Sequence, residues 1–275
     1  MSQADGKANP LYAIVLAAGQ GTRMRSSRAK VLHKVLGRTM VDCSLALLAP
    51  LGVTATALVL GHQSEAVEAA VRSSGIPVPG LRIAIQKEQK GTADAVRSAL
   101  PTLPELATAG GKVLILYGDT PLLTVERLQA LLTQTTGKLG LLSTILPDPH
   151  GYGRLIRTAG KATAIVEHKD CTKDQLAVCE VNAGIYAVDA KFLLESLSQV
   201  HSSSVTREFY LTALVELAVA QGEEVTVIVA PPEEVMGVND RADLAVAESH
   251  MRARINRQHM LAGVTLHDPA TTSID

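Results

Sequence analysis

Aromatic side chains are scarce in this chain of 275 residues, which has five tyrosines, two phenylalanines and no tryptophan. Proteins that bind single-stranded nucleic acid stack its bases on such side chains, so the composition disfavours that class. The formal net charge is only −1 at pH 7, so no overall basic field is available for nucleic acid or an anionic membrane surface. Any phosphate site must therefore be local, and a carbohydrate site would have to rely on hydrogen bonds.

Cysteines and long apolar runs are also rare. Cys43, Cys171 and Cys179 show no C-x-x-C spacing, and their odd number argues against a disulfide framework and fits a reducing cytosol. The sequence has no run of about 18 uninterrupted apolar residues, and residues 1–10, MSQADGKANP, lack the apolar core of a signal peptide. We therefore expect a cytoplasmic protein with a disordered tail at residues 1–10.

Short apolar runs rich in β-branched residues recur in the first 145 residues. These runs are LYAIVLA from Leu11, TATALVL from Thr54, LRIAIQ from Leu81, KVLILY from Lys112 and LGLLSTIL from Leu139. They are continuous rather than alternating, which is typical of strands buried on both faces of a mostly parallel sheet. Segments with helical spacing lie between them, such as SEAVEAAVRSSG, where Ser64 is the expected N-cap and a glycine the stop signal. The pattern predicts a doubly wound α/β unit.

The pattern changes after Pro147. GRLIRT and KATAIVEH flank Ala159-Gly160, which predicts a β-hairpin laid onto the sheet. We expect further strands in CEVNAGIYAVD and EEVTVIVA, and helices in AKFLLESLSQV, FYLTALVELAVAQG and NDRADLAVAESHMRARINRQHML. No linker is long enough to separate autonomous domains, so the second half elaborates the same domain.

Glycine and positive charge gather directly behind the first expected strand, in LAAGQGTRMRSSRAKVLHK. Gly19 and Gly21 leave bare backbone where a parallel sheet opens its ligand crevice, and such backbone can approach phosphate oxygens closely. The alternative is an ordinary strand-to-helix turn with solvated arginines. GQGTRM lacks the third glycine of G-x-G-x-x-G, and no Gly-Lys pair is followed by Ser or Thr, so neither a Rossmann fingerprint nor a P-loop is present.

The longer string LAAGQGTRM, with Lys30 after it in KVLHK, resembles the L-x-x-G-x-G-T-R-M signature of nucleotide-sugar pyrophosphorylases. QKEQKGTADAV, LYGDTPLL, GYGRLIR, IVEHKD, EVNAGIYAVD and GVNDR follow in that order over more than 200 residues. Together these motifs resemble the uridyltransferase half of the bacterial family of bifunctional N-acetylglucosamine-1-phosphate uridyltransferases and glucosamine-1-phosphate acetyltransferases.

The resemblance implies a fold and a domain plan. The fold would be Rossmann-like and of the GT-A type, a doubly wound, mostly parallel sheet with an inserted β-hairpin. Residues 11–245 would form the nucleotidyltransferase domain. Residues 246–275 would form a C-terminal helix and the start of a truncated or absent β-helix domain, so the acetyltransferase activity would be missing.

The resemblance also implies a reaction. UTP and N-acetylglucosamine 1-phosphate would give UDP-N-acetylglucosamine and pyrophosphate, with Mg²⁺ as cofactor, for cell-wall and peptidoglycan synthesis. One alternative is the same chemistry on another sugar 1-phosphate or nucleotide. The other is a nucleotide-sugar-binding module without turnover. The oligomeric state stays open.

Each site residue receives a role from the same resemblance. Arg23 and Lys30 would be the catalytic cations on the triphosphate, and Asp119 and Asn239 would bind the metal. Gly153, Glu167 and Asn182 would bind the sugar. The nucleotide would lie against Leu16, Ala17, Ala18, Gly19, Gly21, Gln86, Gly91, Thr92, Tyr117, Gly118 and Asp119, with Gln86, Gly91 and Thr92 reading the uracil.

Ordinary structural roles remain open for several of these residues. Asp119 in LYGDTP could belong to a plain turn, and Glu167 could be a solvated charge at a strand end. Asn182 interrupts an apolar strand, where a ligand or a backbone group would satisfy its buried amide, and Gln86 poses the same choice. Asn239 could cap the helix that follows it.

Three departures from the family's usual pattern bear on specificity. Ala93 and Asp94 stand where the family typically has Gly-His, and Ala213 stands where aspartate is usual. SSSVTREFY lacks the usual paired asparagines. The exact sugar and base preference is therefore left open, while the phosphate loop, Lys30 and the two expected metal ligands are unaffected.

Overall fold

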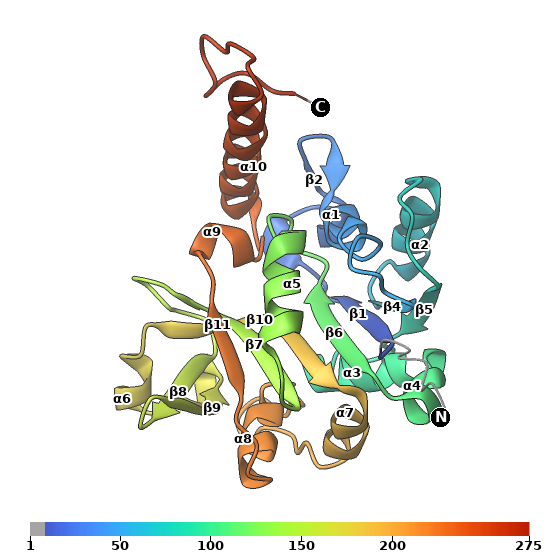
Figure 1. Cartoon of the computed structure of the whole chain (residues 1–275), viewed down its shortest axis with the longest axis vertical. Helices are drawn as coiled ribbons and strands as arrows, with labels where there is room; N and C mark the ends of the chain where they lie inside the picture. The colour runs from blue at the N-terminus through green and yellow to red at the C-terminus, as the bar shows by residue number, and fades with distance from the viewer. Residues whose placement is uncertain (1–8, 275) are drawn as a thin grey trace, which may run out of the picture.

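A computed structural model describes residues 9–274, and a nine-stranded mixed sheet forms its centre (Figure 1). Most of the expected N-terminal tail, residues 1–8, lies outside the described residues. The strand order is β11-β7-β10-β6-β1-β4-β5. The bounds of these strands are β1 Leu11–Ala17, β4 Ala55–Leu60, β5 Leu81–Ile85, β6 Lys112–Tyr117, β7 Leu139–Ile145, β10 Glu180–Asp189 and β11 Thr226–Val229.

Most pairings in this sheet are parallel. Strand β1 pairs in parallel with both β4 and β6, β4 with β5, and β7 with β11. Strand β10 is the exception, because it runs antiparallel between β6 and β7. Every residue of β4 is buried, as expected for a continuous apolar run with both of its faces covered. The predicted Rossmann-like, mostly parallel fold is confirmed.

Helices cover both faces of the sheet, so the sheet has a separate apolar core on each side. Ile14 of β1 enters the core shared with α3, α4, α7 and α8, while its neighbour Val15 enters the core shared with α1, α2 and α5. This division follows from the alternation of side chains along a strand. The bounds are α1 Met40–Ala46, α2 Ser64–Ser73, α3 Thr92–Ala99, α4 Glu105–Ala109, α5 Val125–Gln134, α7 Ala190–Leu197 and α8 Ala213–Ala220.

The start of α2 differs from its prediction. Ser64 is the first helical residue, and the N-cap is Gln63, in a left-handed conformation with φ of 56° and no capping bond from its side chain. The Gln63 amide instead donates to the carbonyl of Ser27 at 2.7 Å, so the residue serves the loop after β1 rather than the helix. The glycine stop signal is confirmed, because Gly75 has a φ of 73°.

The predicted hairpin is formed by β8 (Arg154–Thr158) and β9 (Lys161–Val166), which pair antiparallel. Both turn residues, Ala159 and Gly160, have positive φ values of 50° and 81°, as in a type I′ turn. The hairpin joins the main sheet where Arg154 pairs with Val181 of β10. Its place beside the start of β10, which runs antiparallel to β6, brings the loop before β8 toward the carboxyl-end edge of β6.

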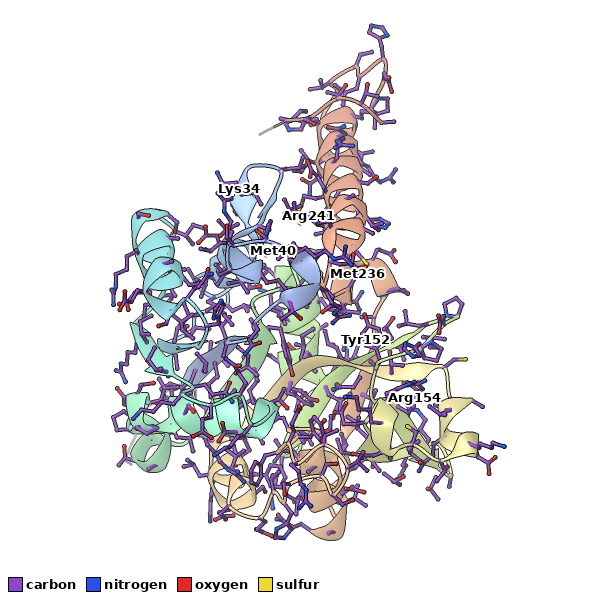
Figure 2. All side chains as sticks on the ribbon, turned by 180° about the vertical axis from the view of Figure 1, so that it is seen from behind. Lys34, Met40, Tyr152, Arg154, Met236 and Arg241 are labelled. Carbon is purple, nitrogen blue, oxygen red and sulfur yellow. The ribbon has the colours of Figure 1, made fainter. Side chains whose placement is uncertain are left out.

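The helix α10 (Arg241–Leu261) projects away from the sheet (Figure 1). A small third apolar cluster, which includes Met40, Leu122 and Ala247, anchors its first turns, with Met236 packed against it. Figure 2 shows Met40, Met236 and Arg241 together at this base. The remaining described elements are β2 Lys34–Val35, β3 Arg38–Thr39, α6 Lys173–Leu176, α9 Pro232–Val235, and the 3-10 turns Thr22–Met24, Lys30–Leu32, Leu100–Thr102 and His168–Asp170.

The two-faced burial of β1 generates a stability prediction. Ile14 is fully buried, whereas Ile85 of the edge strand β5 is 47% exposed. We expect Ile14→Ala to lower the free energy of unfolding by about 2–5 kcal/mol, because it removes buried methyl groups and leaves a cavity. Ile85→Ala deletes the same atoms and should cost under about 1 kcal/mol. Urea unfolding of both variants measures the difference, and equal losses would contradict the placement of β1 between two cores.

Candidate functional site

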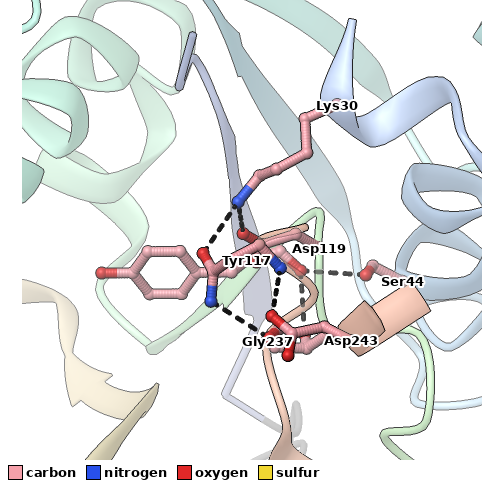
Figure 3. Close-up of polar contacts among 8 residues, drawn as sticks. Lys30, Ser44, Tyr117, Asp119, Gly237 and Asp243 are labelled. Carbon is pink, nitrogen blue, oxygen red and sulfur yellow. Dashed lines mark hydrogen bonds and ion pairs between the residues drawn. The ribbon is translucent and has the colours of Figure 1, made fainter. Parts of the chain in front are cut away.

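Three segments that are far apart in the sequence meet beyond the carboxyl ends of β1 and β6. The loop after β6 lies against β1, because the Gly118 amide donates to the carbonyl of Leu16 at 2.9 Å. The segment before α10 lies against the same loop, because the Val238 amide donates to the carbonyl of Asp119 at 2.9 Å. Ser44 of α1 also holds the loop, because its hydroxyl donates to the carbonyl of Tyr117 at 2.9 Å (Figure 3). This edge is where open α/β sheets place their ligands.

Lys30 connects these segments through its side chain. Its Nζ donates to Oδ2 of Asp119 in an ion pair and lies 3.4 Å from Oδ1 of Asn239 (Figure 3). The side chains of Lys30 and Asp119 are only 12% and 17% exposed. The amide nitrogen of Asn239 donates to the carbonyl of Gly237 at 3.2 Å, which turns its oxygen toward the ammonium group. A positive charge is thus held between a carboxylate oxygen and an amide oxygen.

The alternative role of Asn239 as a helix cap is wrong. The N-cap of α10 is the next residue, Asp240, whose carboxylate accepts from the amides of Ala242 at 2.8 Å and Asp243 at 3.0 Å. The backbone amide of Asn239 donates to Oδ2 of Asp243 at 2.9 Å. The side-chain oxygen of Asn239 is consequently available to a cation. Among residues 9–274, no cluster of three or more His, Cys, Asp or Glu side chains could hold a metal ion.

A cavity of about 310 Å³ opens between the loop after β1 and the start of α3. Its lining contains most of the residues expected to bind the nucleotide, together with Lys30. These residues are Leu16, Ala17, Ala18, Gly19, Gln86, Gly91, Thr92, Tyr117 and Asp119. The structure therefore brings the predicted nucleotide residues to one place.

Three of the residues predicted to bind the nucleotide or its triphosphate do not line this cavity. Arg23 lies exposed in the turn Thr22–Met24. Gly21 has a φ of 63°, and a Cβ there would meet Cβ of Lys30 at 2.5 Å, so this glycine makes room for the lysine. Gly118 acts through its backbone amide, which ties the loop after β6 to β1.

A second cavity of about 230 Å³ contains the three residues expected to bind the sugar, Gly153, Glu167 and Asn182. Its lining also includes Thr92, Tyr117 and Asp119, which line the first cavity as well. The two cavities are therefore neighbours that meet at a shared wall. Asp119 stands on that wall, and the ammonium of Lys30, from the lining of the first cavity, is paired with it.

Glu167 is not the solvated charge that the sequence left open as an alternative. Its Oε1 accepts from the hydroxyl of Thr212 at 3.1 Å, and burial raises the pKa of its carboxyl group above the usual value. A Cβ at Gly153 would lie 3.0 Å from Cγ2 of Ile165 and 3.4 Å from Oε2 of Glu167, so a side chain there would crowd Ile165. Gly153 and Glu167 therefore lie side by side in the wall of the second cavity.

A bulge in β10 positions Asn182. The pairing register of β10 with β7 shifts between Asn182 and Tyr186. The amide nitrogen of Asn182 donates to the hydroxyl of Tyr186 at 2.7 Å, and its oxygen accepts from the amide of Gly184 at 3.0 Å. Both polar atoms are thus satisfied by the chain itself, and each keeps the capacity for one more hydrogen bond. Gly184 has a φ of 78°, and a Cβ there would meet the Tyr117 ring at 2.7 Å.

Sequence reasoning missed Tyr210 and Thr212, which line the second cavity. Thr212 directly precedes α8, so its sequence position indicates a helix cap. In the structure its side chain makes no capping bond and donates to Glu167 instead. Local sequence could not reveal this role of Thr212, because its partner Glu167 lies 45 positions away along the chain.

A model of the MobA-like NTP transferase domain matches residues 13–170, which is more than half of the chain. The chain belongs to this family. No helix within residues 9–274 combines the length and the apolar character needed to cross a membrane.

Relatives of this NTP transferase domain confirm the resemblance seen in its motifs. This chain is 48% identical over 268 residues to the bifunctional protein GlmU of Anaeromyxobacter sp. (strain Fw109-5), and the match covers 97% of this chain and 54% of that protein. It is 43% identical over 268 residues to the bifunctional protein GlmU of Geobacillus sp. (strain WCH70), covering 96% and 56%. The chain spans about half the length of these curated relatives.

Solved structures share the fold of this NTP transferase domain at low sequence identity. The inositol-1-phosphate CTP transferase from T. maritima superposes with a TM-score of 0.62 at 18% identity, covering 86% of this chain and 92% of that one. A Bacillus anthracis protein described as a glucose-1-phosphate thymidylyltransferase gives a TM-score of 0.67 at 18% identity, covering 87% and 94%. The α/β nucleotidyltransferase fold is thereby confirmed.

The buried carboxyl group of Glu167 generates a pH prediction. Because its pKa is raised in the folded state, the folded chain binds more protons than the unfolded chain, and the stability falls as the pH rises through the interval between the two pKa values. Glu167→Gln removes this cost, so we expect a higher melting temperature than wild type at pH 7.5. The gain should shrink as the pH falls through this interval and vanish below the ordinary carboxyl pKa of about 4.

Glu180 offers a control with the opposite sign. Its hydrogen bonds from Arg157 and Ser143 hold the pKa of its carboxyl group below the usual value. Glu180→Gln should therefore lower the melting temperature at pH 7.5, with the loss shrinking at low pH. Thermal unfolding of both variants from pH 7.5 to about 3 checks the pair, because the Glu180 loss shrinks only below the ordinary carboxyl pKa of about 4. A loss of stability in Glu167→Gln at pH 7.5 would contradict the assignment.

Proposed function

We propose that this chain transfers a uridylyl group from UTP to N-acetylglucosamine 1-phosphate, giving UDP-N-acetylglucosamine and pyrophosphate. The observation that carries the proposal is the shared wall of the two cavities at Thr92, Tyr117 and Asp119. A nucleotide in the first cavity and a sugar phosphate in the second would meet there. The ordered motifs of the sequence and the relatives support the same assignment.

The reaction needs little acid-base chemistry. A phosphate oxygen of the sugar phosphate is already an anion, and it would attack the α-phosphorus of UTP while the bond to the bridging oxygen of the leaving pyrophosphate breaks. The main task is to hold two polyanions in line and to offset their repulsion. Lys30, on the wall of the nucleotide cavity beside Asp119, is placed to stabilise the negative charge of the departing pyrophosphate. Arg23, in the same loop, would approach the triphosphate from solvent.

Nucleotidyltransferases of this family generally use a divalent metal ion, and we infer that the ion is Mg²⁺. The donor set fits, because Asp119 Oδ2 and Asn239 Oδ1 already face one positive group, the ammonium of Lys30. Two hard oxygens are a sparse set that phosphate oxygens and water would complete. When bound, the metal supplies charge neutralisation at the reacting phosphates.

Two alternative functions compete with this proposal. The first is another sugar 1-phosphate or nucleotide, since cavity edges decide such preferences. The second is a module that binds nucleotide sugars without turnover. The contacts of Lys30 with Asp119 and with Asn239 favour turnover, because a module that only binds has no need of this cation and oxygen set. The domain boundary at residue 245 and the cytoplasmic location stay predictions.

A pyrophosphate-release assay across sugar 1-phosphates and nucleoside triphosphates tests the proposed reaction. We expect the highest kcat/KM with UTP and N-acetylglucosamine 1-phosphate. Lys30→Met should lower kcat about 100-fold, because one charge contact to a transition-state phosphate is worth about 3 kcal/mol. Lys34→Met, at an exposed lysine of the same segment, is the control and should stay near wild type. Activity of Lys30→Met within a few-fold of wild type would contradict the role of Lys30.

Asn239 generates a separate prediction about the metal. Asn239→Ser withdraws the amide oxygen, so we expect the Mg²⁺ concentration for half-maximal activity to rise about tenfold. Asp240→Ala is the matched control, since loss of the α10 cap should cost about 1 kcal/mol of stability and leave the Mg²⁺ dependence unchanged. Titration of activity with Mg²⁺ measures both variants, and an unchanged midpoint in Asn239→Ser would remove Asn239 from the metal site.

A further inference from the structure

The side-chain amide of Gln86 has a fixed orientation in the nucleotide cavity. Gln86 follows β5, is 4% exposed and lines that cavity. Its Nε2 donates to Oδ2 of Asp94 at 2.8 Å and to the carbonyl oxygen of Gly91 at 3.1 Å. An ionised carboxylate and a backbone carbonyl can only accept hydrogen bonds, so both partners require the NH₂ end of the amide.

The opposite end of the amide is left for a ligand. With both hydrogens of Nε2 engaged, the carbonyl Oε1 must point the other way, and none of residues 9–274 donates a hydrogen bond to it. Several buried side-chain atoms in that part of the chain have no hydrogen-bond partner, and Oε1 of Gln86 is not one of them. Since it has no partner either, it is not buried and is open to the cavity. The cavity therefore presents a fixed acceptor at this point.

The backbone that carries Asp94 is held in place by neighbouring residues. Asp94 lies in the first turn of α3, and the start of α3 is pinned to residues 209–211 by two hydrogen bonds, from the Ala93 amide to the Phe209 carbonyl and from the Leu211 amide to the Thr92 hydroxyl, both at 2.9 Å. At Gly91 a Cβ would approach the Phe209 carbonyl oxygen to 2.4 Å, so the loop permits no side chain there.

We propose that Asp94 is a positioning residue that sets the base preference of the nucleotide cavity. By holding Nε2 of Gln86, it presents Oε1 to the base, and this acceptor selects a pyrimidine whose ring nitrogen carries a hydrogen, as N3 of uracil does. Cytosine has an acceptor at N3, which would face the acceptor Oε1 and leave both unpaired. The inference rests on the proposed function, because it concerns the base of the nucleotide in that same reaction.

The strength of this selection depends on both partners of Nε2. Without the carboxylate, Gly91 alone restrains the amide through one hydrogen bond of 3.1 Å, and rotation of the amide by half a turn would present NH₂ to the base. An asparagine at position 94 can still accept through its own carbonyl oxygen, whereas a leucine of similar size cannot accept at all. These two substitutions separate hydrogen-bond orientation from side-chain volume.

The experiment compares kcat/KM for UTP and CTP in wild type, Asp94→Asn and Asp94→Leu. In Asp94→Leu we expect the UTP to CTP ratio to fall about tenfold, mainly through a higher KM for UTP, with kcat nearly unchanged. In Asp94→Asn the ratio should stay within about twofold of wild type. Asp174→Leu replaces an exposed aspartate in the first turn of another helix, α6, and should leave the ratio unchanged.

An unchanged ratio in a folded Asp94→Leu variant would overturn the proposal, and so would an equal loss in Asp94→Asn. Calorimetric binding of UTP and of CTP, without sugar phosphate, separates this inference from the proposed function. If the chain forms no product but prefers UTP, and Asp94→Leu removes that preference, the proposed reaction is wrong and the role of Asp94 stands. If wild type binds both nucleotides equally, or neither, the role of Asp94 is wrong.

Discussion

The contact of Lys30 with Asp119 and Asn239 is the interaction on which the candidate site depends. Asp119 lies 89 positions after Lys30 in the sequence, and Asn239 lies 209 positions after it. The contact joins them where little solvent reaches the charged groups. A partly buried ammonium group needs oxygen partners, and a partly buried carboxylate needs a positive one. The loop after β1, the loop after β6 and the segment before α10 are therefore held in one arrangement even without a ligand.

The topology explains why the two cavities share a wall. Strands β1 and β6 are parallel neighbours, so their carboxyl ends open the nucleotide cavity on one edge. Strand β10 runs antiparallel beside β6, and its bulge between Asn182 and Tyr186 places the sugar side of the site next to Tyr117. The hairpin attached to β10 adds Gly153 and Glu167. The antiparallel strand thus supplies what a purely parallel sheet lacks, a second binding surface at the same edge.

Local patterns predicted the fold because buried parallel strands appear as continuous apolar runs, and Ala159-Gly160 marked the hairpin by its turn chemistry. They were weaker at helix starts, because Gln63 rather than the expected Ser64 caps α2. The partners of Lys30 and Glu167 lie too far along the chain for any local pattern to reveal. The site residues came from the family resemblance, and their mutual geometry from the fold.

A crystal structure of the chain with UDP-N-acetylglucosamine and Mg²⁺ tests the central claim most directly. The account predicts the uracil beside Gln86 and Gly91, the sugar against Glu167 and Asn182, and the metal on Asp119 and Asn239. Lys30 should then have left Asp119 for a phosphate oxygen. A nucleotide sugar bound elsewhere, or bound at this edge with Lys30 still paired to Asp119 and no metal between them, would contradict the account.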